Sequence, residues 1–255
     1  MKKITYNWEN IDWKRANKIV REQQQEIVRA TELNDRKMIY KLQRKLVMGW
    51  ASCALAIRRV TTSPGSKTPG IDKELWNTPK KKYEAIQKIR KIAMNPNGYK
   101  ASSVKKVYIP KPGSEERRPL SILTLTDRAV QALYHLAIDP VVETLSDLDS
   151  YGFRRFRSAQ DCITLSQSRI FPTWVMEADI EKCFDKINHD FLIENTIICD
   201  KKIITEWLKA GVLEAGKISQ TSEGMPQGGV ISPLLCNITL NGIETFIKKT
   251  ANEEG

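Results

Sequence analysis

The sequence predicts an α+β protein with a helix-rich front half, and three observations support this. Apolar residues recur at helical spacing through residues 13–57. Residues 104–123 change to the pattern of two strands around a Pro-Gly turn. Residues 1–118 hold 28 Lys and Arg against 11 Asp and Glu, a net of +17, whereas residues 119–255 hold 13 against 19, a net of −6. A basic front suited to a polyanion therefore precedes an acidic back suited to metal ions.

A helical hairpin is predicted at the front of the chain. Asn10 or Asp12 can cap the first helix, and Asn34-Asp35 is expected to end it. The second helix is expected to run from Met38 toward Ile57 without a break. Most of the basic residues of this hairpin are expected on its outer surfaces.

The middle of the chain alternates between loops, helices and a strand pair. Residues 63–72, rich in Pro and Gly, are predicted to form a loop, and Thr78-Pro79 is predicted to open a helix that reaches about Ala93. Two strands are expected over 104–109 and 117–123.

The back half is predicted to contain several helices and one short strand. Thr126 is expected to cap a helix that Pro140 disturbs, and Ser158 with Asp161 resembles a capping box. The remaining elements are an apolar strand over 173–180 and helices near 189–198, 200–211 and 230–249.

The strand over 173–180 carries Glu177 and Asp179. A carboxylate at the end of a buried strand is costly unless it is paired, and a divalent metal is a common partner. Phosphoryl transfer to a 3′-hydroxyl typically needs two metal ions that are bridged by carboxylates. Asp179 fits such a bridge, with the Ile180 carbonyl beside it, and Phe184 one turn later can pack under a sugar. An ion-paired or capping aspartate is the structural alternative.

The segment Gly224–Pro233 has two glycines beside a proline, just before a predicted helix. Such a backbone can approach a ligand closely, and Gln227 can bond a base or a sugar. A plain helix-entry loop is the alternative.

The predicted hairpin carries Lys111 near its tip and Arg118 on its second strand. Cations on opposed strands suit a triphosphate, because guanidinium groups bind phosphate through two hydrogen bonds. A hairpin whose edge is protected by charge is the alternative.

Aromatic and Arg side chains alternate through Ser150–Ser158. This interleaving suits stacking on bases and contact with phosphates. The alternative is a structural loop with exposed arginines.

Along the chain the four motifs follow in the order basic hairpin, Ser150–Ser158, Asp179 strand and Gly224–Pro233. This order resembles that of reverse transcriptases, especially those encoded by bacterial group II introns. Residues 11–30, 54–72 and 102–122 also resemble the front of those proteins, and the resemblance spans residues 8–250. It implies the helical N-terminal extension, fingers and incomplete palm of a right-hand polymerase. The implied divisions are 1–72 for the extension, 73–172 for the fingers and 173–255 for the palm.

The resemblance also implies roles for single residues. Asp179 would be catalytic and would bind Mg²⁺, together with the Ile180 carbonyl. Phe184 would exclude a ribose 2′-hydroxyl. The residues that would contact the incoming dNTP are Lys111, Arg118, Phe184 and Gln227. The residues that would follow the template or intron RNA are Lys14, Arg15, Lys18, Arg21 and Arg154.

One departure concerns the family motif Tyr-Ala-Asp-Asp, which follows the Gln227 segment in reverse transcriptases. No two aspartates are adjacent in this sequence, and the last aspartate is Asp200. These residues alone are therefore not expected to polymerise DNA on a primer. They would belong to a split enzyme whose second polypeptide carries the rest of the palm and thumb, to an artificially shortened front half, or to a natural remnant.

Two other functions remain open: a non-catalytic intron-RNA-binding splicing module, and a fragment of a host-defence reverse transcriptase. A homodimer is also compatible with the sequence. Five scattered cysteines fit reduced thiols in the cytoplasm, the count of two histidines argues against a histidine-based zinc site, and no apolar run suits a membrane or a signal peptide.

Overall fold

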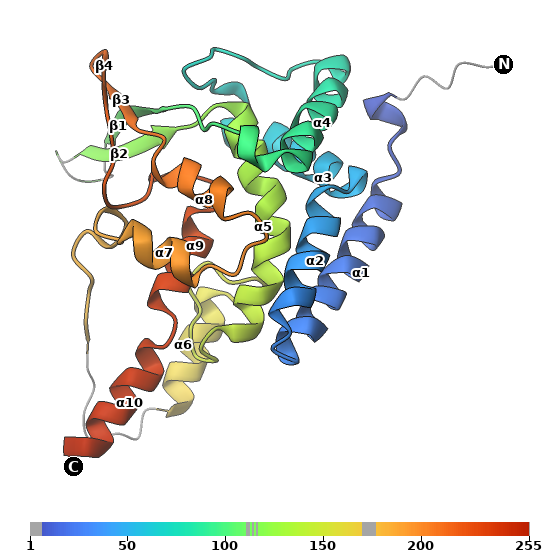
Figure 1. The fold of residues 1–255 in the computed structure, drawn as a ribbon. Helices are drawn as coiled ribbons and strands as arrows, with labels where there is room; N and C mark the ends of the chain where they lie inside the picture. Colours follow the sequence, from blue (N-terminus) through green and yellow to red (C-terminus); the bar gives the residue numbers. More distant parts are fainter. Residues whose placement is uncertain (1–6, 111–112, 114, 116, 170–176, 255) are drawn as a thin grey trace.

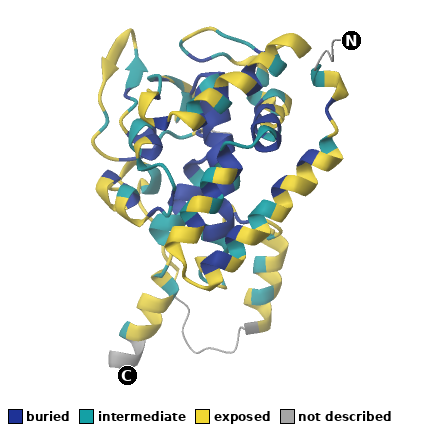
Figure 2. Ribbon diagram, turned by 45° about the vertical axis from the view of Figure 1, so that its right-hand side comes forward, coloured by how far each residue is buried: buried dark blue, intermediate teal, exposed yellow. Residues whose placement is uncertain are grey.

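Helix α5 (Leu125–Leu145) forms the centre of the molecule (Figure 1). Figure 2 shows that the buried residues concentrate along this helix. Five of the other described helices pack against it, and a four-stranded sheet lies at one edge, which confirms the predicted α+β class. The computed structural model describes residues 7–110, 113, 115, 117–169 and 177–254.

Three helices at the front pack against α5. The Asp12 carboxylate accepts a hydrogen bond from the Arg15 amide at 2.9 Å, as the predicted N-cap requires. The prediction of one continuous second helix was wrong, because the structure has two helices there, separated at Gly49. A Cβ there would lie 3.0 Å from the Leu46 carbonyl and 2.8 Å from the Ser52 hydroxyl. The front helices are α1 (Trp13–Glu32), α2 (Arg36–Val47) and α3 (Trp50–Thr62).

Helix α4 (Pro79–Met94) begins at the predicted cap, Thr78, which accepts a hydrogen bond from Lys81 N. The cap of α5 was predicted two residues too late: Thr124 Oγ1 accepts from the Asp127 amide at 3.1 Å. Pro140 lies inside α5 without ending it. Proline has no N–H for the carbonyl of Leu136, and the Gln24 side chain of α1 donates to that oxygen instead, at 2.7 Å.

The predicted hairpin is confirmed as β1 (Val104–Pro110) paired antiparallel with β2 (Arg117–Ile122). Two strands that the sequence did not predict complete the sheet, β3 (Val212–Glu214) and β4 (Lys217–Ser219). The strand order is β2-β1-β3-β4, and β1 runs parallel to β3. Strands of three residues are too short to show alternation, which explains why the sequence pattern missed them.

The predicted strand over 173–180 is wrong in the part that the structure describes. Residues 177–180 have no regular structure and are exposed, while residues 173–176 lie outside the described residues. The predicted capping box is confirmed, because the Asp161 carboxylate accepts from the Ser158 amide at 2.8 Å. The last predicted helix is divided at Asn241-Gly242. The back helices are α6 (Ala159–Arg169), α7 (His189–Asn195), α8 (Lys201–Leu208), α9 (Ser232–Leu240) and α10 (Ile243–Glu254).

One buried cluster crosses the three predicted divisions of the chain. It joins side chains of α1–α3, such as Ile27 and Ile57, to Leu133 of α5 and to Ile203 and Leu235 of the back helices. The divisions at 72 and 172 are therefore not marked by separate cores, and their boundaries stay predictions. Among the described helices, none is long and apolar enough to cross a bilayer.

Candidate nucleotide and template site

The Gly224–Gly229 loop is fastened to the turn that carries Phe184. The Met225 amide donates to the Phe184 carbonyl at 2.7 Å, and the Gly224 amide donates to Ile187 O at 2.8 Å. The buried His189 ring places Nε2 2.7 Å from the Gly224 carbonyl. Gly224 has φ +78°, and a Cβ there would meet the Asp185 carbonyl oxygen at 2.7 Å. Only glycine allows these two backbones to approach so closely.

The same loop is joined to strand β2. The Ser121 amide donates to the Gln227 carbonyl at 2.7 Å. Gly228 has φ +107°, and a Cβ there would lie 2.8 Å from the Leu120 side chain. The side-chain nitrogen Nε2 of Gln227 lies 3.4 Å from Asp185 Oδ1 and donates to it. Three segments that are far apart in the sequence therefore meet, and they bring Gln227 next to the Phe184 turn.

A cavity of about 330 Å³ lies where the loop, the sheet and α8 meet. Lys106 of β1 lines it and forms an ion pair with Glu214 of β3 at 3.2 Å. Hydrogen bonds to Tyr108 and Glu214 raise the pKa of Lys106. Sequence patterns did not single out Lys106, because nothing local shows that β3 lies beside β1. Other polar residues that line the cavity are Ser121, Asp185, Glu223 and Gln227.

The remaining predicted nucleotide and metal residues are less tightly grouped. Arg118 is exposed on β2, where it pairs in register with Ile109. Lys111 lies outside the described residues. Asp179 and Ile180 are exposed in the irregular stretch before the Phe184 turn. The backbone bonds described above hold Phe184 and Gln227 together but do not include Asp179.

The described residues do not by themselves fit a two-metal centre. Within residues 7–110, 113, 115, 117–169 and 177–254, no group of three or more His, Cys, Asp or Glu side chains is placed to hold a metal ion. Two bridged ions need several carboxylates. Asp179 supplies one of them, so a metal pair at this position would need further carboxylates from another segment.

The four cations predicted to contact RNA at the front are all exposed on α1. They lie on the surface opposite the buried Ala16 and Val20. Lys18 forms an ion pair with Glu22 at 3.9 Å, between two well-exposed side chains, which adds little stability. The four residues are Lys14, Arg15, Lys18 and Arg21.

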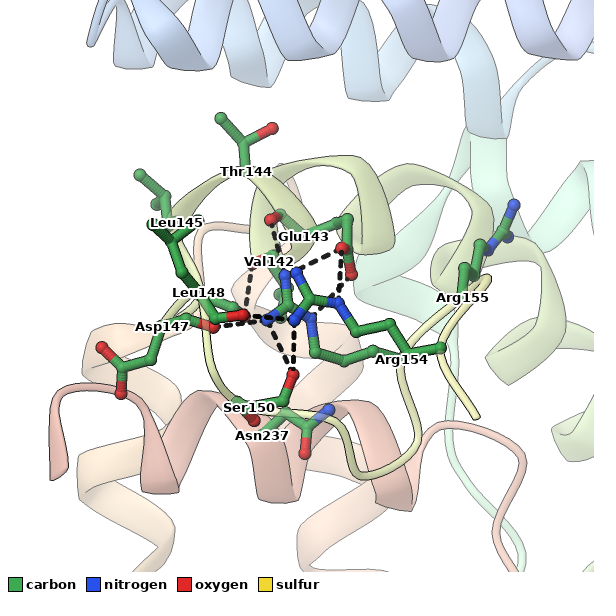
Figure 3. Close-up of polar contacts among 12 residues, drawn as sticks. Val142, Glu143, Thr144, Leu145, Asp147, Leu148, Ser150, Arg154, Arg155 and Asn237 are labelled. Atoms are coloured by element: carbon green, nitrogen blue, oxygen red, sulfur yellow. Dashed lines mark hydrogen bonds and ion pairs between the residues drawn. The ribbon is translucent and has the colours of Figure 1, made fainter. Parts of the chain in front are cut away.

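The fifth predicted RNA contact, Arg154, is wrong, because its side chain is only 3% exposed. Its guanidinium donates to the Glu143 carboxylate at 2.8 and 3.0 Å and to the carbonyls of Glu143, Asp147 and Ser150 (Figure 3). A buried guanidinium needs such partners, and those bonds leave no donor facing solvent. The sequence motif did not show this, because residue type alone does not say whether an arginine faces inward.

The four-stranded sheet and the Gln227 loop lie together at the place where the sequence predicts the site of a template-directed polymerase. Residues 109–254 match the model for "Reverse transcriptase (RNA-dependent DNA polymerase)", and residues 8–89 match "N-terminal domain of reverse transcriptase". The chain therefore belongs to the reverse transcriptase family.

Curated relatives include proteins of group II introns. The group II intron-encoded protein LtrA of Lactococcus lactis subsp. cremoris is 37% identical over 169 residues, which cover 63% of this chain and 28% of LtrA. Protein YkfC of Escherichia coli is 33% identical over 205 residues, which cover 76% of this chain and 54% of YkfC. The chain thus spans about half of these relatives' length or less.

A solved structure shows the same fold. A chain of the "Partial Cas6-RT-Cas1--Cas2 complex" aligns with a TM-score of 0.51 at 21% identity, covering 80% of this chain and 34% of that one. At this identity the likeness concerns the fold alone. The predicted α+β polymerase fold and the predicted family are both confirmed by these matches.

Proposed function

We propose that these residues form the extension, fingers and first part of the palm of an RNA-directed DNA polymerase of the group II intron type. The observation that carries the proposal is the joining of Ser121, Phe184 and Gln227 through short backbone bonds. The β2 strand, the Phe184 turn and the Gln227 loop are joined by these bonds, which supports a dNTP site in this region. Template RNA and a DNA primer are the other proposed ligands.

The proposed metal is Mg²⁺, with Asp179 as one of its ligands and the remaining carboxylates supplied by another segment of palm. The sequence holds no adjacent aspartates, which supports this division. A further segment that carries the rest of the palm and thumb is therefore part of the proposal. A cytoplasmic location is proposed as well, because the five cysteines are free and the Cys183 and Cys236 sulfurs, 3.7 Å apart, share a hydrogen bond rather than a disulfide.

Primer extension tests the polymerase proposal directly. These 255 residues alone are expected to show no synthesis with Mg²⁺, while addition of the palm and thumb segment of LtrA is expected to restore it. Asp179→Asn in the complemented enzyme is expected to abolish synthesis, because the amide has the same shape without the charge. Robust extension by the 255 residues alone, or by the Asp179→Asn enzyme, would contradict the proposal.

RNA binding is expected to weaken steeply with salt, because the basic front releases counterions from phosphates. Neutralising the four α1 cations should reduce the slope of log affinity against log salt by about 3, at roughly 0.7–0.9 per phosphate contact. The control is the variant Lys209→Gln/Lys217→Gln, which removes two exposed cations of the back half and should leave the slope nearly unchanged. Equal losses in both variants would show that α1 is not the RNA surface.

Phe184→Val is expected to raise incorporation of ribonucleotides in the complemented enzyme while deoxynucleotide incorporation persists. A full ring under the sugar leaves no room for a 2′-hydroxyl, and valine relieves that contact. Phe184→Tyr keeps the ring and should keep the original ratio. Because Phe184 also packs against the core, a melting curve for each variant is needed. An unchanged sugar ratio in a folded Phe184→Val enzyme would exclude Phe184 from sugar selection.

A further inference from the structure

The aromatic loop, defined as residues 150–157, turns Arg154 and Arg157 toward the protein and its phenylalanines toward solvent. Phe153 is 69% exposed and Phe156 is 101% exposed. Asn237 of α9 holds the loop from beneath by donating to the Gly152 carbonyl at 2.9 Å. The alternating sequence suggested both stacking on bases and contact with phosphates, and this arrangement favours the stacking.

Each arginine of the aromatic loop has an acidic partner. Arg154 binds the Glu143 carboxylate, and Arg155 binds Asp139 at 2.6 Å. Arg157 lies 4.0 Å from Glu143, and its guanidinium sits over the Tyr151 ring at 5.2 Å. The charges of the three arginines are therefore paired with carboxylates within the fold.

The two phenylalanines have an unusual backbone. Phe153 has φ +57° and Phe156 has φ +58°, the left-handed region that side chains other than glycine rarely adopt. This backbone conformation is unfavourable, and the exposure of two large apolar rings to water adds a second unfavourable contribution to the free energy of folding. Arg154 donates to the Asp147 and Ser150 carbonyls and Arg157 donates to the Ser150 carbonyl, and these bonds hold the backbone in this state. Strain of this kind that the fold maintains is commonly linked to ligand binding.

The aromatic loop also lies beside the candidate nucleotide site. The rings of Phe153 and Phe184 meet edge to face, with centroids 6.5 Å apart. The Phe184 turn is in turn bound to the Gln227 loop. A strand that presents a base at this site must pass close to Phe153.

We propose that Phe153 and Phe156 stack on unpaired bases of an RNA strand at the nucleotide site. The inference rests on the proposed function and names the residues that hold the strand. Stacking needs an exposed aromatic surface and tolerates any base, since every base has a π-face. Unpaired bases fit better than a protein surface, because the rings are held beside Phe184 rather than within a continuous apolar face. The rings distinguish single strands from duplexes, whose bases are already stacked.

Single-stranded RNA carrying 2-aminopurine tests the stacking, because its fluorescence falls when the base stacks on a ring. The full 255-residue chain should quench it, and Phe153→Ala/Phe156→Ala should abolish the quenching and weaken binding about tenfold for each ring. Phe153→Tyr/Phe156→Tyr keeps both rings and should retain both effects. The matched control is Phe246→Ala on α10, since Phe246 is 71% exposed and comparable to Phe153.

The salt slope separates this inference from the proposed function. The alanine pair should lower the affinity at every salt concentration without changing the slope, because no phosphate contact is lost. Unchanged affinity and quenching in the alanine pair would overturn the stacking inference while leaving salt-dependent RNA binding intact. A wild-type dimer that the alanine pair dissociates would also overturn it, since the rings would then be a protein contact. No RNA binding by the wild type would contradict the proposed function itself.

Discussion

Asp200→Ala is expected to lower the free energy of unfolding by about 3–5 kcal/mol. The Asp200 carboxylate, which is 9% exposed, accepts two hydrogen bonds from Arg44 at 2.7 Å. It also accepts from the Tyr134 hydroxyl at 2.6 Å, and burial together with this bond raises the pKa of Tyr134. Alanine leaves a guanidinium and a hydroxyl without their partner in a largely buried place.

Arg44 belongs to α2, Tyr134 to α5, and Asp200 precedes α8. Because the carboxylate links three helices, the loss of stability should be measurable by urea unfolding. Asp200→Asn keeps an acceptor oxygen and should cost less. The control is Glu84→Ala, which breaks an ion pair with Lys80 whose side chains are 85% and 62% exposed, and should change stability by less than about 0.5 kcal/mol. A loss below about 1 kcal/mol for Asp200→Ala would show that the three helices do not depend on this carboxylate.

Gly224→Ala is expected to disrupt the Gln227 loop. Its φ of +78° is unfavourable for alanine by about 1–2 kcal/mol. The new methyl group would also lie 2.7 Å from the Asp185 carbonyl oxygen, so the loop must move away from the Phe184 turn. A steric conflict in a packed site typically costs about 1–3 kcal/mol more. Primer extension by the complemented enzyme should fall together with stability.

Gly216→Ala is the matched control for that prediction. Gly216 has φ +81°, but a Cβ there meets no atom within 4 Å. It therefore carries the backbone cost without the collision. Thermal unfolding of both variants gives the difference between their losses of stability. Equal losses at the two positions would show that the close approach at Gly224 does not contribute to stability.

Local signals predicted several helix starts correctly. The caps at Asp12 and Thr78 and the pair Ser158 and Asp161 need only a short polar side chain beside free backbone amides. The β1–β2 hairpin was also predictable, since its two strands are near neighbours in the chain. The break at Gly49 was not, because α2 and α3 pack on the same core and the apolar spacing continues across the gap.

The parts that were missed depend on contacts between distant residues. Pro140 is tolerated in α5 only because Gln24, from another helix, binds the carbonyl that proline leaves free. Arg154 is drawn inward by Glu143. Phe184 and Gln227 were predicted as members of one site, and the structure explains their proximity through the Met225 amide, which donates to the Phe184 carbonyl. No local pattern shows this bond.

The order of the sheet has a consequence for how the chain is made. Strand β1 has β2 on one side, which follows within a few residues, and β3 on the other, where Val104 pairs with Val212. A ribosome that has released the hairpin must therefore synthesise all of α5 through α8 before the second side of β1 is covered. During that interval the nascent chain presents an open strand edge, which is a site for unwanted pairing between chains. Lys105 and Lys106 of β1 carry positive charges that repel the same strand of another nascent chain until β3 has formed.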